Sequence, residues 1–337
     1  MIREAIDALV AGQSLSIDQA AQTMDEIMDG EATPAQFGAF VTALRLKGET
    51  PEEIAGMARV MREKSLHVHV EGSLVDTAGT GADASNSFNI STTAGFVVAG
   101  AGVMVAKHGN RAMSGSCGSA DVLEGLGMKI ELSPEGVRRC LEEVGFGFMF
   151  AQTYHPSMRF AAAPRREIGI RTVFNILGPL TNPAGAKNHL VGVADPTVGN
   201  QMAQVLGRLG STHALVVHGQ DGLDEVSLGD ATQVWEMRDG AVSAYTISPE
   251  ELGFARAPRE ALRAGSVEEA THILRQVLGG RPGPTRDVTL ANAAAALLAA
   301  DRVTTLKDGV ALAAESIDSG EAQKVLDRVL ELSQKLK

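Results

Sequence analysis

Two polar segments of the sequence combine glycine, hydroxyl and amide groups in a way that could bind a phosphate. Residues 76–83, DTAGTGAD, follow a short apolar run, and their glycines allow successive backbone N–H groups to converge on an anion. Residues 87–92, SFNIST, precede an apolar helical pattern, and a helix N-terminus is a natural anion site. An ordinary strand-to-helix turn is the simpler explanation of the first segment alone. A single helix cap explains the second less well, because one cap does not need four polar residues.

A third and a fourth segment supply positive charge. Residues 107–111, KHGNR, follow a strand-like run and continue through a polar loop into a helix start at Ser119. Such a loop could close over a polyphosphate and shield it from water, although single cations are more often solvated and a single histidine more often structural. Arg165 opens the stretch RREIGIRT, and the planar fork of an arginine suits a carboxylate. A charged turn of a surface helix is the simpler explanation of these residues alone.

A fifth segment places two acids side by side after another strand-like run. Asp224 and Glu225 lie in the stretch HGQDGLDEV. Adjacent carboxylates repel each other unless a cation lies between them, and hard oxygen ligands combined with substrate phosphates suit Mg²⁺. An acid pair in a solvated loop is the commoner case, so this segment indicates a cation site only in combination with the others.

The first 66 residues predict a small all-helical domain. Three segments begin with a capping residue that is followed three positions later by Gln or Glu, the pattern of a capping box. Apolar residues recur at helical spacing behind each of these starts. The three pairs are Ser16 with Gln19, Thr33 with Gln36, and Thr50 with Glu53.

From residue 67 onward, strand-like and helical patterns alternate, which is typical of an α/β domain with a mostly parallel sheet flanked by helices. In such sheets ligands bind at the carboxyl ends of the strands, where three of the five segments fall. The expected strands are 74–75, 103–106, 146–150, 191–194, 215–217 and 234–237. The expected helices are 92–99, 119–126, 134–144, 199–209, 267–278, 290–300 and 322–334.

Composition narrows the classes of protein that fit. The 337 residues have a formal net charge of -11, which argues against a nucleic-acid partner, because binding phosphates along a nucleic acid normally needs a basic face. Two cysteines suit a reducing compartment. The N-terminus has no apolar signal core, and apolar stretches are too short to cross a bilayer. We therefore expect a cytoplasmic protein without a membrane partner.

Taken in order, the five segments resemble the anthranilate phosphoribosyltransferase family from end to end. GTGAD is similar to its GTGGD loop, FNIST is identical to its next motif, and KHGN, GSADVLEGLG, RREIGIRTVFNILGPLTNPA and HGQDGLDEVS all resemble family segments. The resemblance implies transfer of the 5-phosphoribosyl group from phosphoribosyl pyrophosphate (PRPP) to the amine of anthranilate. The products would be N-(5-phosphoribosyl)anthranilate, an intermediate of tryptophan biosynthesis, and pyrophosphate.

The resemblance also implies the domain organisation and the assembly. Residues 1–66, with a return segment near 165–185, would form the helical domain. Residues 67–164 and 186–337 would form the α/β domain. Family members are usually homodimers through the helical domain, so we expect the same here.

Site residues follow from the motif positions. Anthranilate would be held by Asn110 and Arg165, with Gly79 at its edge, and no residue is expected to act as a general acid or base. The ligands implied for two Mg²⁺ ions are Ser91, Asp224 and Glu225. The residues implied for PRPP are Gly79, Ala82, Asp83, Ser87, Asn89, Ile90, Ser91, Thr92, Lys107, His108, Gly109, Asn110, Arg111 and Ser119.

The chain departs from the family pattern in both substrate loops. Ala82 replaces the second glycine of a pair, and Ser87 replaces a threonine. Backbone N–H groups would do the binding in the first loop, so Ala82 should cost little unless its φ is positive. The second loop is less basic than usual, which bears on the affinity for PRPP more than on the activity itself. Its changed positions are Ala112, Gly115, Ser116 and Cys117.

Two alternatives share the expected architecture. A pyrimidine-nucleoside phosphorylase also has a glycine-rich phosphate loop, but the pair Asp224 and Glu225 and the RREIGIRT stretch favour the transferase. A relative that binds nucleic acid without catalysis is opposed by the acidic balance of the chain and by its intact substrate motifs.

Overall fold

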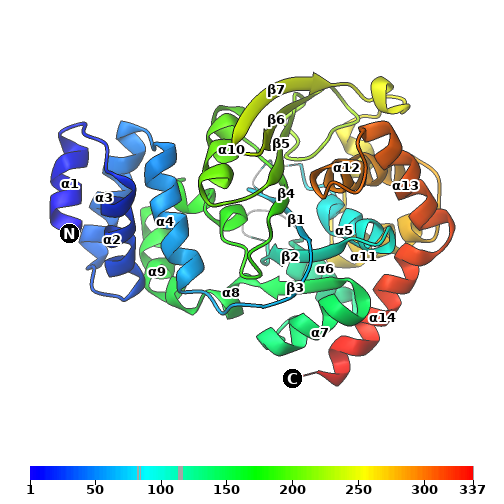
Figure 1. The fold of residues 1–337 in the computed structure, drawn as a ribbon, viewed down its shortest axis with the longest axis horizontal. Helices are drawn as coiled ribbons and strands as arrows, with labels where there is room; N and C mark the ends of the chain where they lie inside the picture. The colour runs from blue at the N-terminus through cyan, green and yellow to red at the C-terminus, as the bar shows by residue number, and fades with distance from the viewer. Residues whose placement is uncertain (82, 84, 113–116, 337) are drawn as a thin grey trace.

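The N-terminal helices form one end of the molecule (Figure 1). The computed structural model describes residues 1–81, 83, 85–112 and 117–336. The helix α9 (Arg159–Ile168) packs against α2 and α3 although it lies far along the chain, and its Ala161 shares a core with the N-terminal helices. The N-terminal helices are α1 (Ile2–Val10), α2 (Ile17–Met28), α3 (Pro34–Lys47) and α4 (Pro51–Glu63).

The three expected capping boxes are confirmed. The hydroxyl of Thr50 accepts the N–H of Glu53 at 3.2 Å, and the carboxylate of Glu53 accepts the N–H of Thr50 at 2.8 Å. Equivalent reciprocal bonds start α2 at Ser16 and α3 at Thr33. Glu53 is buried and also accepts the N–H of Leu15 at 2.8 Å, so one local cap additionally ties α4 to the start of α2.

A seven-stranded sheet forms the body of the rest of the chain, in the order β3-β2-β1-β4-β5-β6-β7. The five neighbouring strands from β3 to β5 in this order are parallel. Strand β6 is antiparallel to both of its neighbours, β5 and β7, so the expected mostly parallel sheet is confirmed. The strands are β1 (Leu74–Gly79), β2 (Met104–Gly109), β3 (Phe146–Phe150), β4 (Asn188–Gly192), β5 (His213–Gly219), β6 (Thr232–Arg238) and β7 (Ala241–Ile247).

Helices cover both faces of the sheet (Figure 1). Alternate residues of β5 point to opposite faces, as the pleat of a strand requires: Leu215 and Val217 belong to one core, and Ala214 and Val216 to the other. The second core also contains α10 (Gly199–Arg208) and the N-terminal helices. The first core is covered by α5 (Ile90–Gly100), α6 (Ser119–Leu126), α7 (Pro134–Val144), α11 (Val267–Leu278), α12 (Pro284–Ala299), α13 (Leu306–Asp318) and α14 (Glu321–Lys335).

Several expected boundaries were wrong. Strand β4 ends at Gly192 rather than at residue 194, and α12 begins at Pro284 rather than at residue 290, because a proline is well suited to the first turn of a helix. The elements that were not expected are β7, α13, α9 and the short α8 (Ala151–Tyr154). Within the described residues, no helix is both long and apolar enough to span a bilayer.

The carboxyl ends of four parallel strands meet at one edge of the sheet. Strands β1, β2, β4 and β5 each end in a glycine: Gly79, Gly109, Gly192 and Gly219. Gly79 pairs in register with Gly192. The loops that follow these strands, with the N-termini of α5 and α6, therefore lie together at this edge.

Candidate active site

The two adjacent acids bridge separate elements at this edge. Asp224 accepts the N–H of Gly81 at 2.9 Å through Oδ2, and Glu225 accepts the N–H of Ser91 at 3.1 Å through Oε1. The carboxylates thus point in different directions, one to the loop after β1 and the other to the first turn of α5. The structure therefore joins three of the segments that the sequence singled out.

A close backbone contact holds the acid-bearing loop in place. A Cβ atom on Gly192 would lie 1.6 Å from the carbonyl oxygen of Asp224, so only glycine lets the loop approach β4 this closely. On the other side, Asn292 of α12 accepts the N–H of Val226 at 2.9 Å and donates to its carbonyl at 3.0 Å. Both constraints act on the backbone of the loop rather than on the two carboxylates.

Lys107 brings a buried positive charge to the same place. Its Nζ donates to the hydroxyl of Ser91 at 3.2 Å, and it also donates to the carbonyl of Thr77. Burial lowers the pKa of this ammonium, while the negative charges of Asp76 and Glu225 oppose that shift. A cation, a hydroxyl and a carboxylate thus meet at the start of α5.

Burial and neighbouring negative charges raise the pKa of both acids. Burial, and then the nearby charge of Asp83, raise the pKa of Asp224 to about 7. Burial and the charge of Asp224 raise the pKa of Glu225 well above its ordinary value. Crowded carboxylates of this kind favour either protonation or a bound cation.

The side chains available as ligands indicate what kind of cation could bind. The described residues contain no group of three or more His, Cys, Asp or Glu side chains placed to hold a metal ion. A dedicated all-protein cage is therefore not formed by these residues. Mg²⁺ commonly binds through one or two carboxylates plus substrate phosphates and waters, which is the arrangement that Asp224 and Glu225 could complete.

Buried polar atoms without hydrogen-bond partners occur in the loop after β1 and in the first turn of α5. They are Oδ2 of Asp83, Oδ1 of Asn89 and Oγ1 of Thr92, counted over the described part of the chain. Asn89 is the N-cap residue of α5 but makes no side-chain cap bond, and its amide donates instead to the carbonyl of Cys117 at 3.1 Å. Because buried polar groups are normally paired, such a concentration indicates a site for a polar ligand.

The remaining predicted residues of the loop after β1 and of the start of α5 make local contacts or lie outside the described residues. The Ser87 hydroxyl accepts a hydrogen bond from the Ser85 hydroxyl at 3.1 Å. Ile90 is buried as the first residue of α5. Ala82, together with Gly115 and Ser116 of the second loop, lies outside the described residues.

The KHGNR segment packs tightly against the start of α6. A Cβ atom on Gly109 would lie 2.2 Å from the hydroxyl of Ser119, and that hydroxyl donates to the carbonyl of Asn110 at 3.3 Å. The guanidinium of Arg111 forms ion pairs with Asp121 at 3.1 Å and Glu124 at 2.5 Å. The charge of Arg111 is therefore already balanced by acids of α6.

His108 turns away from the anion site. Its backbone N–H donates to the carboxylate of Asp76 at 3.1 Å, and its ring Nδ1 lies 3.2 Å from the carbonyl of Gly178. Burial lowers the pKa of the imidazole to about 3. The ring is therefore neutral, and it connects β2 to the segment near 165–185.

Arg165 lies on α9, where its guanidinium contacts Phe174. Its guanidinium is 5.3 Å from the ring centroid of Phe174 and donates to the Phe174 carbonyl at 3.5 Å. Burial lowers its pKa. Among the hydrogen bonds and ion pairs of the described residues, none joins Arg165 to the loop after β1, to Lys107 or to the acid pair. Gly79, Asn89, Lys107 and Glu225 are thus brought together, whereas Arg165 faces the helical side.

Three residues of the site were given no individual role from the sequence. Asp76 and Thr77 belong to the first of the five segments and lie in β1, but no function was assigned to either side chain. Arg259 comes from a distant 3-10 turn and donates to the carbonyls of Asp221 at 2.6 Å and Asp83 at 3.3 Å. No local pattern marks Arg259, because its partners are backbone atoms far away in the sequence.

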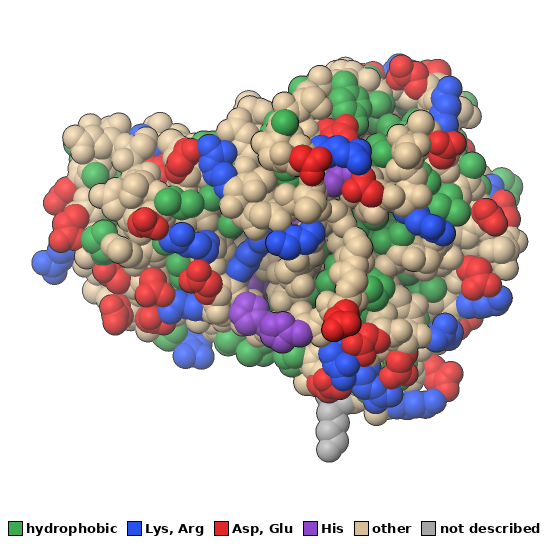
Figure 2. All heavy atoms as spheres, viewed as in Figure 1, with side chains coloured by type: hydrophobic (Ala, Val, Ile, Leu, Met, Phe, Trp, Pro, Cys, Tyr) green, Lys and Arg blue, Asp and Glu red, His purple; other side chains and the backbone are tan. Residues whose placement is uncertain are grey.

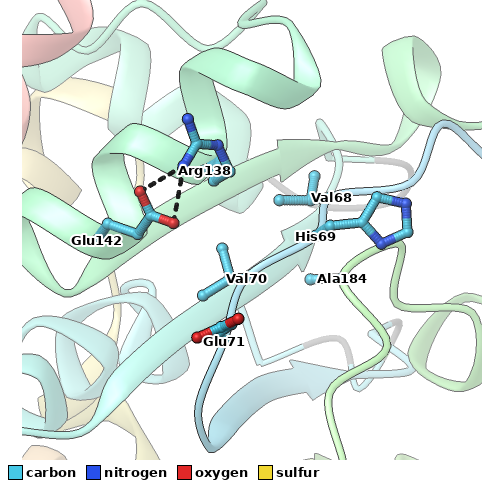
Figure 3. Close-up of a pocket in the computed structure, with 7 residues that line it drawn as sticks. All are labelled: Val68, His69, Val70, Glu71, Arg138, Glu142 and Ala184. Carbon is cyan, nitrogen blue, oxygen red and sulfur yellow. Dashed lines mark hydrogen bonds and ion pairs between the residues drawn. The ribbon is translucent and has the colours of Figure 1, made fainter.

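A pocket of about 440 Å³ lies elsewhere, beside the chain segment that leads into β1 (Figure 3). It is lined by residues 68–71, Ala184 and two residues of α7, Arg138 and Glu142. Arg138 is already ion-paired there with Glu142 at 2.7 Å and with Glu135 at 2.5 Å. Because this pocket lies at the amino end of β1, it is separate from the loops that follow Gly79.

On the face of the molecule shown in Figure 2, acidic and basic side chains are interspersed over both ends.

Comparison with family models covers most of the chain. Residues 3–65 match the helical bundle domain of the glycosyl transferase family, and residues 71–323 match its a/b domain. The two models together describe an enzyme built from a helical domain and an α/β domain, as the structure has it.

Individual relatives and solved structures agree. The chain is 59% identical over 327 residues to an anthranilate phosphoribosyltransferase of Symbiobacterium thermophilum, covering 97% of this chain and 96% of that protein. It is 54% identical to one of Dehalococcoides mccartyi, covering 100% and 99%.

Among solved structures, the enzyme of Thermus thermophilus superposes with a TM-score of 0.93 at 45% identity, covering 98% of this chain and 99% of that one. The enzyme of Saccharomyces cerevisiae in complex with PRPP and Mg gives 0.91 at 26% identity, covering 99% and 98%. These relatives favour the transferase over both alternatives, and the chain belongs to the anthranilate phosphoribosyltransferase family of enzymes.

Proposed function

We propose that the edge formed by the loops after β1, β2 and β5 is where PRPP reacts with anthranilate. The observation that carries this proposal is the meeting of Ser91, Lys107 and Glu225 at the N-terminus of α5. Backbone N–H groups of the loop from Gly79 to Asp83 would receive the pyrophosphate group. Residues 87–92, the side chain of Lys107, the backbone of the KHGNR segment after it, and Ser119 would bind the rest of PRPP.

We propose two Mg²⁺ ions held by Ser91, Asp224 and Glu225 together with substrate oxygens. A structure of the yeast relative contains PRPP and Mg, and the crowded carboxylates of this chain fit such a cation. When bound, Mg²⁺ would supply positive charge that stabilises the departing pyrophosphate. Asp224 and Glu225 are then the residues that fix where this charge lies.

The chemistry needs little proton transfer from the protein. The aromatic amine of anthranilate is already neutral at pH 7 and can attack C1 of the ribose directly. As the C1–O bond breaks, negative charge grows on the pyrophosphate and positive charge on the ribose. Backbone N–H groups of the glycine loop and the ammonium of Lys107 would stabilise the leaving group in fixed positions, which is the most effective use of such dipoles.

Anthranilate would approach from the helical side. A structure of the yeast relative contains 4-fluoroanthranilate. In this chain Arg165 offers a guanidinium to the carboxylate of the substrate, and Asn110 and Gly79 would border the amine. In-line placement of the amine would supply much of the remaining acceleration.

The direct test is the loss of anthranilate fluorescence when PRPP is added to the purified protein, with and without Mg²⁺. We expect turnover that requires both PRPP and Mg²⁺. Persistence of fluorescence at saturating concentrations of both, with protein that melts cooperatively, would overturn the proposal. Phosphorolysis of thymidine in a parallel assay would instead support the phosphorylase alternative.

We further propose a cytoplasmic homodimer formed through the helical domain. Val10 at the end of α1 and Leu46 near the end of α3 are 74% and 83% exposed. Their helices pack against each other. Covering these two apolar side chains would favour association.

A further inference from the structure

The backbone pairing between β1 and β2 stops early. Its register ends at Val75 with Val105, whereas the pairing of β1 with β4 continues to Gly79, and that of β2 with β3 continues to Gly109. Both strands are fully described over this length. The ladder of backbone hydrogen bonds between β1 and β2 therefore ends before the carboxyl ends of the two strands, directly beside the candidate site.

Two buried side chains supply hydrogen bonds beyond the point where this pairing ends. Asp76 accepts the N–H of His108 at 3.1 Å through Oδ1, and through Oδ2 it accepts the amide of Asn182 at 2.7 Å. The same amide of Asn182 donates to the carbonyl of Ala106 at 2.8 Å. Val105 donates its N–H toward β3, so the alternate groups of Ala106 and His108 face β1. Asp76 and Asn182 thus replace the missing strand-to-strand bonds.

This replacement contributes less to the stability of the fold than a continuous ladder of backbone hydrogen bonds would. Asp76 is 1% exposed and Asn182 is 2% exposed, and burial raises the pKa of Asp76 to about 6. Buried charged and amide groups stabilise a fold less effectively than well-packed apolar groups or a continuous ladder. The arrangement is therefore better explained by what it holds in position.

Lys107 lies in the part of β2 that has no backbone pairing with β1. Its Nζ reaches across to Thr77 and to the hydroxyl of Ser91, while the next residue, His108, is held by Asp76. Asn182 also belongs to the segment near 165–185 that contains Arg165. The pair therefore connects the phosphate side of the site with the side proposed for anthranilate.

We propose that Asp76 and Asn182 are positioning residues, which fix β2 relative to β1 beyond the end of their backbone pairing so that Lys107 and the backbone after it face the PRPP site. This inference rests on the function proposed above. Neither side chain is expected to touch a substrate. Their effect is exerted through the placement of Lys107 and His108.

The sharpest test compares Asn182→Ala with Asn188→Ala. Asn188 is also a buried asparagine that bridges to β1, since its amide donates to Ser73 at 2.8 Å and to the carbonyl of Leu74 at 3.4 Å. Asn188 lies at the amino ends of strands β4 and β1, at the opposite edge of the sheet from the site. Thermal unfolding and separate kcat and KM values for both substrates are measured well below the melting temperature.

We expect both variants to lower the melting temperature by a similar amount, about 2–6 °C. Only Asn182→Ala should lower kcat/KM for PRPP, by about 10- to 100-fold, because small displacements of positioned groups are costly for catalysis. Equal kcat/KM for the two folded variants would overturn the inference. Absence of turnover in the unaltered protein would instead overturn the proposed function itself.

A second variant covers the case in which Asn182→Ala does not fold. Asp76→Asn keeps the volume and an acceptor for the N–H of His108, but it places one amide against the amide of Asn182. We expect a folded protein whose kcat/KM for PRPP falls at least about tenfold. A folded Asp76→Asn protein with unchanged kinetics would overturn the positioning role.

Discussion

Glu225 and Ser91 are 134 positions apart in the sequence, yet the carboxylate of Glu225 accepts the N–H of Ser91 at 3.1 Å. This bond lies in the first turn of α5, where unpaired N–H groups and the helix dipole favour a negative charge. Lys107 donates to the hydroxyl of the same serine at 3.2 Å. The contact therefore joins the loop after β5 to the end of β2 through one residue of α5.

The acid pair should be essential for turnover. Replacing Asp224 and Glu225 together by alanine is expected to lower kcat by at least about 100-fold, because the charge that stabilises the leaving group is lost. The protein should still fold, since the loop is held by backbone contacts at Gly192 and Asn292. Loss of anthranilate fluorescence measures kcat, and circular dichroism monitors folding.

A matched control for the acid pair is Asp230→Ala. Asp230 lies in the same loop but forms a surface ion pair with Arg256 at 3.0 Å. This substitution should leave kcat within about twofold, as exposed ion pairs contribute little. Retention of normal kcat by the double variant at saturating Mg²⁺ would contradict the metal assignment.

Arg165→Ala should affect anthranilate binding selectively. Losing a charge-assisted bond to a carboxylate costs about 1.5–3 kcal/mol, which corresponds to a rise of about 10- to 150-fold in KM for anthranilate. The KM for PRPP should change much less. Arg166→Ala, which alters the exposed neighbour on α9, serves as the control. Comparable changes in both KM values would remove the proposed role of Arg165.

Gly192→Ala should disturb the site through the backbone. The added Cβ would overlap the carbonyl of Asp224, so the loop must move, at a cost of about 1–3 kcal/mol in unfolding free energy. Displacement of the acids should also lower kcat by about tenfold or more. Gly265→Ala is the control, because its Cβ would make an ordinary 3.4 Å contact with Glu269. Equal kcat values for the two variants would contradict this expectation.

His189 should make the protein less stable in mild acid. Burial lowers the pKa of this imidazole to about 3, so between pH 6.5 and that value the unfolded chain binds a proton that the folded chain does not. The unfolding free energy must then fall as the pH falls. Between pH 6.5 and 5 the unaltered protein should lose about 1.6 kcal/mol more than His189→Gln. Denaturant unfolding at the two pH values measures this, and parallel losses would refute it.

Leu46→Glu should weaken the proposed dimer. A charge on this exposed position of α3 would have to be buried on association, which is unfavourable without a partner. Light scattering coupled to size-exclusion chromatography should give twice the chain mass for the unaltered protein and a smaller value for the variant. Leu66→Glu, at an exposed leucine beyond α4, is the control. A monomeric unaltered protein would contradict the expected assembly.

Local features of the sequence determined much of the fold and of the phosphate side of the site. The capping boxes at Ser16, Thr33 and Thr50 could be read directly, because cap and partner lie within three residues of each other. The segments around Gly79 and Asn89 could also be recognised, since glycine loops and helix starts are local devices. The helix α13 was missed because Gly309 lies inside it. That glycine is required by close packing on Ala294, which only the tertiary structure reveals.

Only the tertiary structure decided which charges are available and where the pairing of β1 with β2 ends. Nothing near Arg111 in the motif indicated that Asp121 and Glu124 balance its charge. The bond between Asp76 and Asn182 joins residues 106 positions apart. Such pairings depend on how separate elements pack, because a side chain acquires its partners and its desolvation only when the chain is folded. The sequence therefore identified the chemical groups, and the packing of the sheet determined their arrangement.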